Sequence, residues 1–346
     1  MNETEMYDLF LKQMDFTKIE KYSFLEFVEA LLKEGSIGEK LQTIGEYVFD
    51  TFLYELSVEK SFFIYMIGFV LIFALFQNVL VGKNKYLSRV SFYLAYITVM
   101  TVVMQSFMVL TNVAREAIEE ILTFMELLIP IYETILIFTG NVATATTFCN
   151  FVFLLIYLIE CGMKYILLPG IHIYVLLQFL NHLWEKEKIS QFVELIEKAI
   201  QFVLKTVLGL VLGIQVIENL IATAKDRVSN SAVLEGLSSL PGMGNVFGSS
   251  IDVFLGCGIL VKNCMGGAAF LVLIVLVSTP AVKIFLSTLL YRLLGAILQP
   301  VGEEGFSKCI HGVAKGCELL LKVIGYTVFL FLIVITLICM TTGYGN

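Results

Sequence analysis

The chain has 346 residues, of which 58% are hydrophobic and 15% are charged, and its mean hydropathy is +0.86. This balance lies far outside that of a soluble globular domain. A helix needs about 20 apolar residues to cross a membrane, and several continuous apolar runs meet this length. Because these runs do not alternate with polar residues, they favour helices over barrel strands. We therefore expect an all-α integral membrane protein, and the formal net charge of -7 argues against a nucleic-acid partner.

Residues that commonly carry chemistry show no diagnostic spacing. The seven cysteines form no C-x-x-C pair, and His172, His182 and His311 are far apart in the sequence. Motifs typical of metalloproteases, serine hydrolases and nucleotide-binding enzymes are missing from the sequence. We therefore expect no enzyme activity, no cofactor and no metal site, and we interpret the cysteines as small packing residues.

Residues 1–60 are the candidate for a water-exposed region, and they are acidic. Their apolar residues follow a helical period, which predicts two amphipathic helices separated at residues 35–38. Neither helix is apolar enough to span a membrane. The first residues lack a basic stretch followed by an apolar run, so we expect no cleavable signal within them. The remaining residues, 61–346, are expected to form a polytopic membrane domain.

The first two spans are expected at residues 62–81 and 90–110. The short loop between them contains Lys83, Lys85 and Arg89, and the positive-inside rule places this loop in the cytoplasm. The acidic N-terminal region is then expected outside the cytoplasm.

The next stretch combines an amphipathic helix with broken spans. Residues 112–128 predict an interfacial helix, which leads into a span broken near Pro130. We expect residues 121–159 to form two helices that meet at a turn at Gly140 and are short for ordinary full spans. Broken or re-entrant segments occur in membranes where protein or water surrounds them.

A charged amphipathic helix followed by a span occurs twice in the second half of the chain. Residues 185–205 predict a cytoplasmic amphipathic helix that runs into a span at 202–220. Residues 303–322 predict a similar helix before the last span, at 323–341. A separate span is expected at residues 165–183.

A loop rich in serine and glycine, residues 225–250, precedes the segment that ends at Arg292. We expect a re-entrant piece at residues 251–261 and a span at residues 266–290. Taken together, the pattern predicts a transmembrane helix bundle of about 7–8 spans with interfacial amphipathic helices and re-entrant segments.

Four stretches of the sequence resemble one known family. They read NVAREAIEEILTFMELLIPIYETILIFTGNVATA, LGIQVIENLIATAKDRVSNSAV, GSSIDVFLGCGILVKNCMGG and STPAVKIFLSTLLYRLLGAILQPVG. With the residues around them, from about Ser91 to Thr341, they are similar to the stage III sporulation protein AE family.

The resemblance implies a multi-pass membrane protein of an endospore-forming bacterium, made in the mother cell and placed in the outer forespore membrane. It implies partners encoded in the same operon, including a partner ATPase, that join a forespore-made protein across the intermembrane space. The resulting assembly is viewed as a channel or secretion-like system that serves the forespore. The resemblance assigns no chemistry to this component.

Charged side chains within membrane segments are candidates for function, because each costs about 2.5 to 3.5 kcal/mol to insert. The candidate pore or coupling residues are Glu126, Glu133, Lys283 and Arg292. Glu133 and Lys283 each lie close to a proline and could pair across the bundle, in either a functional or a structural role. The candidate gating glycines, whose alternative role is close helix packing, are Gly242, Gly244, Gly256, Gly258, Gly266 and Gly267.

Three functions remain open on the sequence. In the first, the protein is a conduit or membrane platform within a channel assembly, as a homo-oligomer or with its partners, and a partner ATPase supplies the energy. In the second, it is a secondary transporter that couples a small solute to ions through Glu133 and Lys283. The third is a purely structural scaffold. The resemblance favours the first.

Overall fold

The computed structural model of the chain describes residues 31, 37–80, 85–138, 142–182, 189–213, 244–299 and 304–341, which are helical almost throughout. A π-helical stretch, η1 (Glu160–Leu167), joins α5 to α6, and residues 190–213 form a further helix, called helix 190–213 below. The prediction of an all-α protein is confirmed. The other helices are α3 (Ile37–Leu80), α4 (Lys85–Phe138), α5 (Val142–Ile159), α6 (Leu168–Asn181), α8 (Gly244–Leu298) and α9 (Glu304–Thr341).

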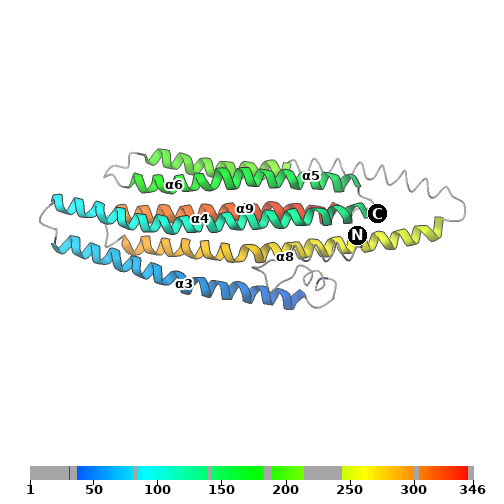
Figure 1. The fold of residues 1–346 in the computed structure, drawn as a ribbon, viewed down its shortest axis with the longest axis horizontal. Coiled ribbons are helices and arrows are strands. Elements are labelled where there is room, and N and C mark those ends of the chain that lie inside the picture. Colours follow the sequence, from blue (N-terminus) through cyan, green and yellow to red (C-terminus); the bar gives the residue numbers. More distant parts are fainter. Residues whose placement is uncertain are drawn as a thin grey trace.

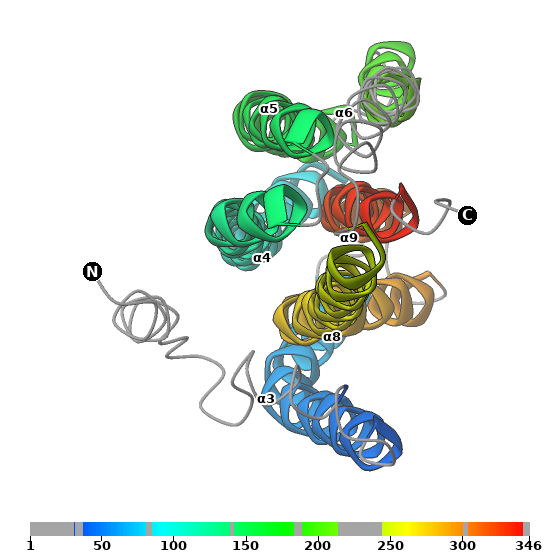
Figure 2. The ribbon, with the colours of Figure 1, turned by 90° about the vertical axis from the view of Figure 1, so that its right-hand side faces the viewer.

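The helices lie side by side in an elongated bundle (Figure 1). Viewed along the bundle, α9 lies between α4, α6 and α8, and α3 packs on the outer side of α8 (Figure 2). The starts of α4, helix 190–213 and α9 lie at one end of the bundle, together with the ends of α3, α6 and α8 (left in Figure 1). This end is called the α8–α9 end below. It is the end that the lysines after the first span would place in the cytoplasm.

The longest helices exceed the thickness of a bilayer. Helix α4 has 54 residues and α8 has 55, so each is about 80 Å long at about 1.5 Å per residue. The hydrocarbon core of a membrane is only about 30 Å thick. A large part of each helix must therefore lie outside the core.

The prediction of 7–8 spans is not supported. Four helical segments in the described part of the chain are long and apolar enough to cross a membrane. The reason is that neighbouring expected spans are continuous in the structure. The expected span 90–110 and the helix expected from residue 121 lie in one apolar segment of α4, and the helix expected to end at residue 159 and the span 165–183 lie in the segment Cys149–Asn181. The amphipathic segment 303–322 and the span 323–341 also form one helix, α9. The four segments are Val90–Thr134, Cys149–Asn181, Asn263–Leu298 and Gly305–Thr336.

Two predicted breaks in the helices are also wrong. Helix α4 continues through Pro130, where we expected a broken span, and Thr134 Oγ1 donates a hydrogen bond to the Pro130 carbonyl. The expected re-entrant piece at residues 251–261 is an ordinary part of α8. The turn expected at Gly140 falls between α4 and α5, outside the described residues.

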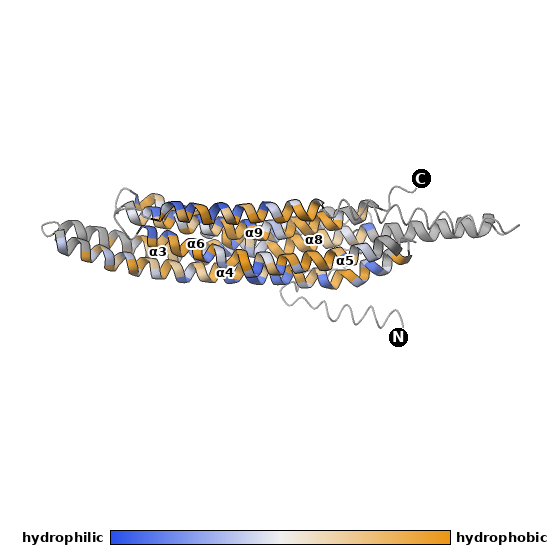
Figure 3. Cartoon of the chain, turned by 90° about the horizontal axis from the view of Figure 1, so that it is seen from above, coloured by the Kyte–Doolittle hydropathy of each residue, from blue (hydrophilic) through white to orange (hydrophobic). Residues whose placement is uncertain are grey.

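Apolar side chains face outward as well as inward. The core contains large aromatic residues such as Tyr96, whose hydroxyl donates to the Phe179 carbonyl at 2.8 Å. Large apolar side chains on the outside include Leu94, Tyr157 and Leu293. Figure 3 shows apolar residues along the coloured part of the bundle, interrupted by polar ones. An apolar exterior of this kind suits contact with lipid.

Candidate functional site

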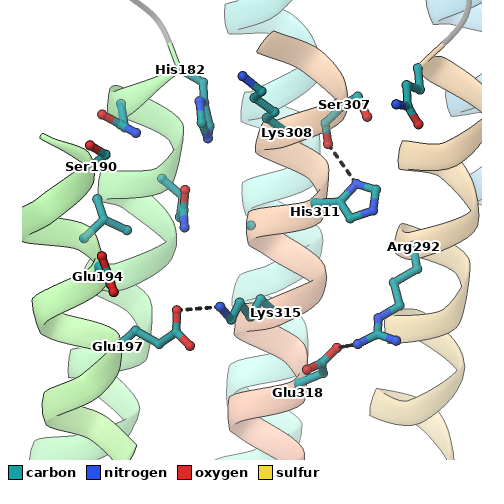
Figure 4. A pocket seen from close by; sticks show the side chains of 15 residues that line it. His182, Ser190, Glu194, Glu197, Arg292, Ser307, Lys308, His311, Lys315 and Glu318 are labelled. Carbon is teal, nitrogen blue, oxygen red and sulfur yellow. Dashed lines mark hydrogen bonds and ion pairs between the residues drawn. The ribbon is translucent and has the colours of Figure 1, made fainter. Parts of the chain in front are cut away.

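A polar cavity of about 810 Å³ lies between α6, helix 190–213, α8 and α9, toward the α8–α9 end. Figure 4 shows side chains from all four helices directed into it. Its charged lining includes Glu197, Arg292, Lys308, Lys315 and Glu318. The cavity thus brings together charges of both signs inside a bundle with a largely apolar surface.

Two ion pairs connect α9 to its neighbours across this cavity. Lys315 Nζ lies 2.7 Å from Glu197 Oε2 on helix 190–213. On the other side, the guanidinium of Arg292 on α8 pairs with Glu318. In both pairs the carboxylate side chain is less exposed than the cation, so the cations screen carboxylates that water reaches poorly.

The spacing of polar residues in α9 explains how this helix serves two surfaces. Lys308, His311, Lys315 and Glu318 recur every three or four residues and therefore share one face of the helix. This face lines the cavity. The apolar residues that we expected to share a face, Phe306, Ile310, Val313 and Leu320, are all buried.

Small residues on α9 allow α6 to approach closely. Gly312 and Gly316 form a G-x-x-x-G pair, a spacing that brings helices together in membranes. A Cβ atom at Gly312 would lie 2.9 Å from Gln178 Cβ, and one at Gly316 would collide with Val175 of α6. The sequence analysis missed this pair, although its spacing was visible in the sequence.

Hydrogen bonds fix the end of the α8–α9 hairpin next to the cavity. Ser307 Oγ donates to the Gly295 carbonyl at 2.8 Å, and His311 Nδ1 lies 3.1 Å from the Ser307 carbonyl oxygen. On helix 190–213, Glu194 also lines the cavity, and Lys198 Nζ lies 2.6 Å from Glu194 Oε1. This hydrogen-bonded ammonium lowers the pKa of the Glu194 carboxyl and keeps it ionised.

The four charged residues that the sequence analysis proposed as candidates lie in different parts of the structure. Only Arg292 lines the polar cavity. Lys283 lies 3.6 Å from Glu55 of α3, and not Glu133 but Glu55 is the carboxylate that the structure places beside it. Glu133 instead lies within hydrogen-bonding range of Cys149 on α5, and Glu126 is exposed on α4.

The candidate glycines fall into two groups. Gly242 lies outside the described residues, and Gly244, Gly256 and Gly258 lie in the first part of α8. Gly266 and Gly267 have close neighbours. A Cβ atom at Gly266 would collide with Cys339 of α9, and one at Gly267 would lie 3.1 Å from Leu31 Cδ1. For this second group the geometry shows close packing.

The sequence analysis also missed the cavity carboxylates, Glu197 and Glu318, and the Lys283 partner, Glu55. Each of these glutamates is a charged residue within an amphipathic segment. That pattern is visible in the sequence, but it does not show which residue each glutamate pairs with. Chemically, the cavity can bind polar or charged groups through hydrogen bonds and ion pairs. Within the described residues, no three His, Cys, Asp or Glu side chains are placed to hold a metal ion.

Comparisons with known proteins identify the family of this chain. Residues 22–342 match the family model described as stage III sporulation protein AE. The chain is 24% identical over 320 residues to the stage III sporulation protein AE of Bacillus subtilis (strain 168), covering 92% of this chain and 79% of that protein. No solved structure matches the chain. Since the family model covers most of its length, the chain belongs to the stage III sporulation protein AE family.

Proposed function

We propose that the protein is a membrane platform within a channel-like assembly that links the mother cell to the developing forespore. Its family places it in sporulation, and its four apolar helical segments give it the character of a membrane protein. The proposal adds the location, the outer forespore membrane, and the partners, which are proteins of the same operon and an ATPase. In this view the partners supply the energy and the protein anchors them in the membrane.

The observation that carries the proposal is the charged cavity at the α8–α9 end. A scaffold that only filled the membrane would need no 810 Å³ cavity lined by Glu197, Arg292, Lys315 and Glu318. Arg292 and Lys315 are about half exposed in this cavity, and Glu197 and Glu318 are less exposed, so charged groups of both signs are within reach of a partner. We propose that this cavity receives polar groups of a partner or of the transported material on the cytoplasmic side.

The test is complementation of a deletion strain of the native spore-forming host. The cavity variant Arg292→Gln should reduce the number of heat-resistant spores at least tenfold and weaken co-purification of operon partners. The variant Glu126→Gln changes an exposed carboxylate on α4 and serves as the control. Normal sporulation by Arg292→Gln at normal protein levels would refute a role for the cavity.

A second function, ion-coupled transport, has one specific observation in its favour. Lys283 and Glu55 lie close together inside the bundle, and buried charges of opposite sign are common in coupled transporters. Vesicles that contain only this protein decide between the two functions. Solute uptake driven by an ion gradient would support the transporter, whereas inert vesicles together with partner capture in cells would support the platform.

A further inference from the structure

A second cavity, of about 340 Å³, lies between α3, α4 and α8, apart from the polar cavity described above. Its charged lining consists of Glu55 from α3, Glu116 and Glu120 from α4, and Lys283 from α8. The lining thus holds three carboxylates and one ammonium, and Glu120 has an interaction partner of its own. Glu59, one helical turn beyond Glu55, lies within electrostatic range of Lys283 and Glu55.

The position of Glu55 gives an independent reason to expect a ligand. This residue is only 6% exposed, and its buried Oε2 atom accepts no hydrogen bond from the described part of the chain. The nearest cation, Lys283 Nζ, is 3.6 Å away, beyond the usual N–H···O distance of about 2.7 to 3.2 Å. Buried carboxylate oxygens nearly always have a hydrogen-bond donor, so the cavity lacks a donor at this atom.

Neutral oxygen atoms add to the acceptors around the cavity. Tyr47 and Thr279 line it and share a hydrogen bond of 3.0 Å between their hydroxyl oxygens. Pro280 has no N–H group, so the carbonyl of Leu276, four residues earlier in α8, lacks its usual main-chain donor. The carboxylates and this carbonyl accept hydrogen bonds, the two hydroxyls can both donate and accept, and Lys283 is the charged donor among the lining residues.

The arrangement of the carboxylates favours an organic cation over a metal ion. Metal ions need several ligands that converge within about 2.6 Å of one point. No three acidic, histidine or cysteine side chains in the described residues meet this requirement. Between the carboxylates the wall is aliphatic, with Val113, Ala117, Val275 and Leu276. An alkyl chain with ammonium groups would match both features, because its methylenes would cover the aliphatic wall and its ammonium groups would reach the carboxylates.

We propose that this cavity binds a small organic ammonium cation, of which an alkyl diamine is the simplest example. Each ammonium group would donate hydrogen bonds to a carboxylate, with Glu55 as the principal acceptor. Hydrogen bonds to charged groups contribute about 1.5 to 3 kcal/mol. This proposal does not depend on whether the protein is a platform or a transporter.

The test is calorimetric titration of the purified full-length protein in detergent with 1,4-diaminobutane. The neutral probe 1,4-butanediol has the same chain length and should not bind. We expect Glu55→Gln and Glu116→Gln each to weaken diamine binding about tenfold or more. Lys283→Met removes the competing ammonium and should strengthen it. The control Glu126→Gln makes the same charge change on α4 outside the cavity and should bind like the unaltered protein.

The outcomes separate site binding from general charge attraction. Tight binding that depends on Glu55 and Glu116 but not on Glu126 supports the proposal. Equal weakening by all three variants, or equal binding of the diol, overturns it. Binding heat that sodium chloride at matched ionic strength reproduces also overturns it, because the cavity would then not select an organic cation. If Glu55→Gln fails to fold, the exposed Glu116 still decides the question.

Discussion

Lys315 and Glu197 join α9 to helix 190–213 through an ion pair in which Nζ lies 2.7 Å from Oε2. The Glu197 side chain is 13% exposed, whereas that of Lys315 is 49% exposed. The carboxylate is therefore the partner that has lost most of its water. Removing the lysine leaves a charge that the surroundings solvate poorly, which is more costly than losing an exposed pair.

We expect Lys315→Met to lower the midpoint of thermal unfolding in detergent, by an amount equivalent to about 1 to 3 kcal/mol. The exchange variant Glu197→Lys with Lys315→Glu should recover part of this loss, because it restores opposite charges. Lys198→Met, which removes the exposed pair with Glu194 on the same helix, is the control and should change little. An equal loss in both lysine variants would show that the Glu197 pair is no stronger than a surface pair.

The close packing of α9 on α6 gives a second prediction. A side chain at Gly316 would collide with Val175, and its next neighbour, Phe107 Cε2, would be 3.1 Å away. We expect Gly316→Ala to lower the unfolding midpoint by the equivalent of about 1 to 3 kcal/mol, because neither neighbour can retreat without disturbing the core.

Gly325 of the same helix is a matched control for this substitution. An added Cβ atom there would have nothing within 4 Å. Since alanine favours a helix over glycine by about 0.5 to 1 kcal/mol, Gly325→Ala should raise the midpoint slightly. If both alanine variants behave alike, the packing of α9 on α6 is looser than the structure shows.

Sequence reasoning predicted the helical class and the apolar faces, but not where helices end. The apolar face of α9 was predictable because Phe306, Ile310 and Val313 follow the helical period. That α9 is one continuous helix was not predictable, because a charged amphipathic segment followed by an apolar one resembles two separate helices. Pro130 misled in the same way, because a proline within a helix can remove one hydrogen bond without ending the helix.

The candidate site was less predictable than the fold, because partners across helices depend on rotation and register. Lys283 was a sound candidate on its own, yet its partner is Glu55, from a segment that we had assigned outside the membrane domain. Glu133 was an equally reasonable partner by composition. A single sequence lists the charges but does not tell which faces meet.

The orientation of the bundle can be tested at the mouth of the polar cavity. Ser190 is exposed and lines this cavity at the α8–α9 end, which we expect in the cytoplasm. A membrane-impermeant maleimide should label Ser190→Cys in inverted vesicles, above the level of the unsubstituted protein, but not in intact cells. Thr146→Cys, exposed near the start of α5 at the other end of the bundle, should give the reverse result. Labelling of Ser190→Cys in intact cells would show that the α8–α9 end lies outside the cytoplasm.

The pair of Lys283 and Glu55 gives the last prediction, because it separates a stabilising ion pair from a site held for function. The Glu55 side chain is 8% exposed and that of Lys283 is 26% exposed, so both are poorly hydrated. Lys283→Met alone leaves the carboxylate without its cation, and we expect the unfolding midpoint, measured without amines, to fall by the equivalent of about 1 to 3 kcal/mol. The double variant Lys283→Met with Glu55→Met removes both charges and should recover most of this loss, since apolar replacement of a buried pair is often neutral or stabilising. A double variant that is stable but fails to support sporulation would show that the charges are kept for function at a cost in stability. A double variant that is less stable than either single variant would contradict this reasoning and identify the pair as a structural element of the α3–α8 interface.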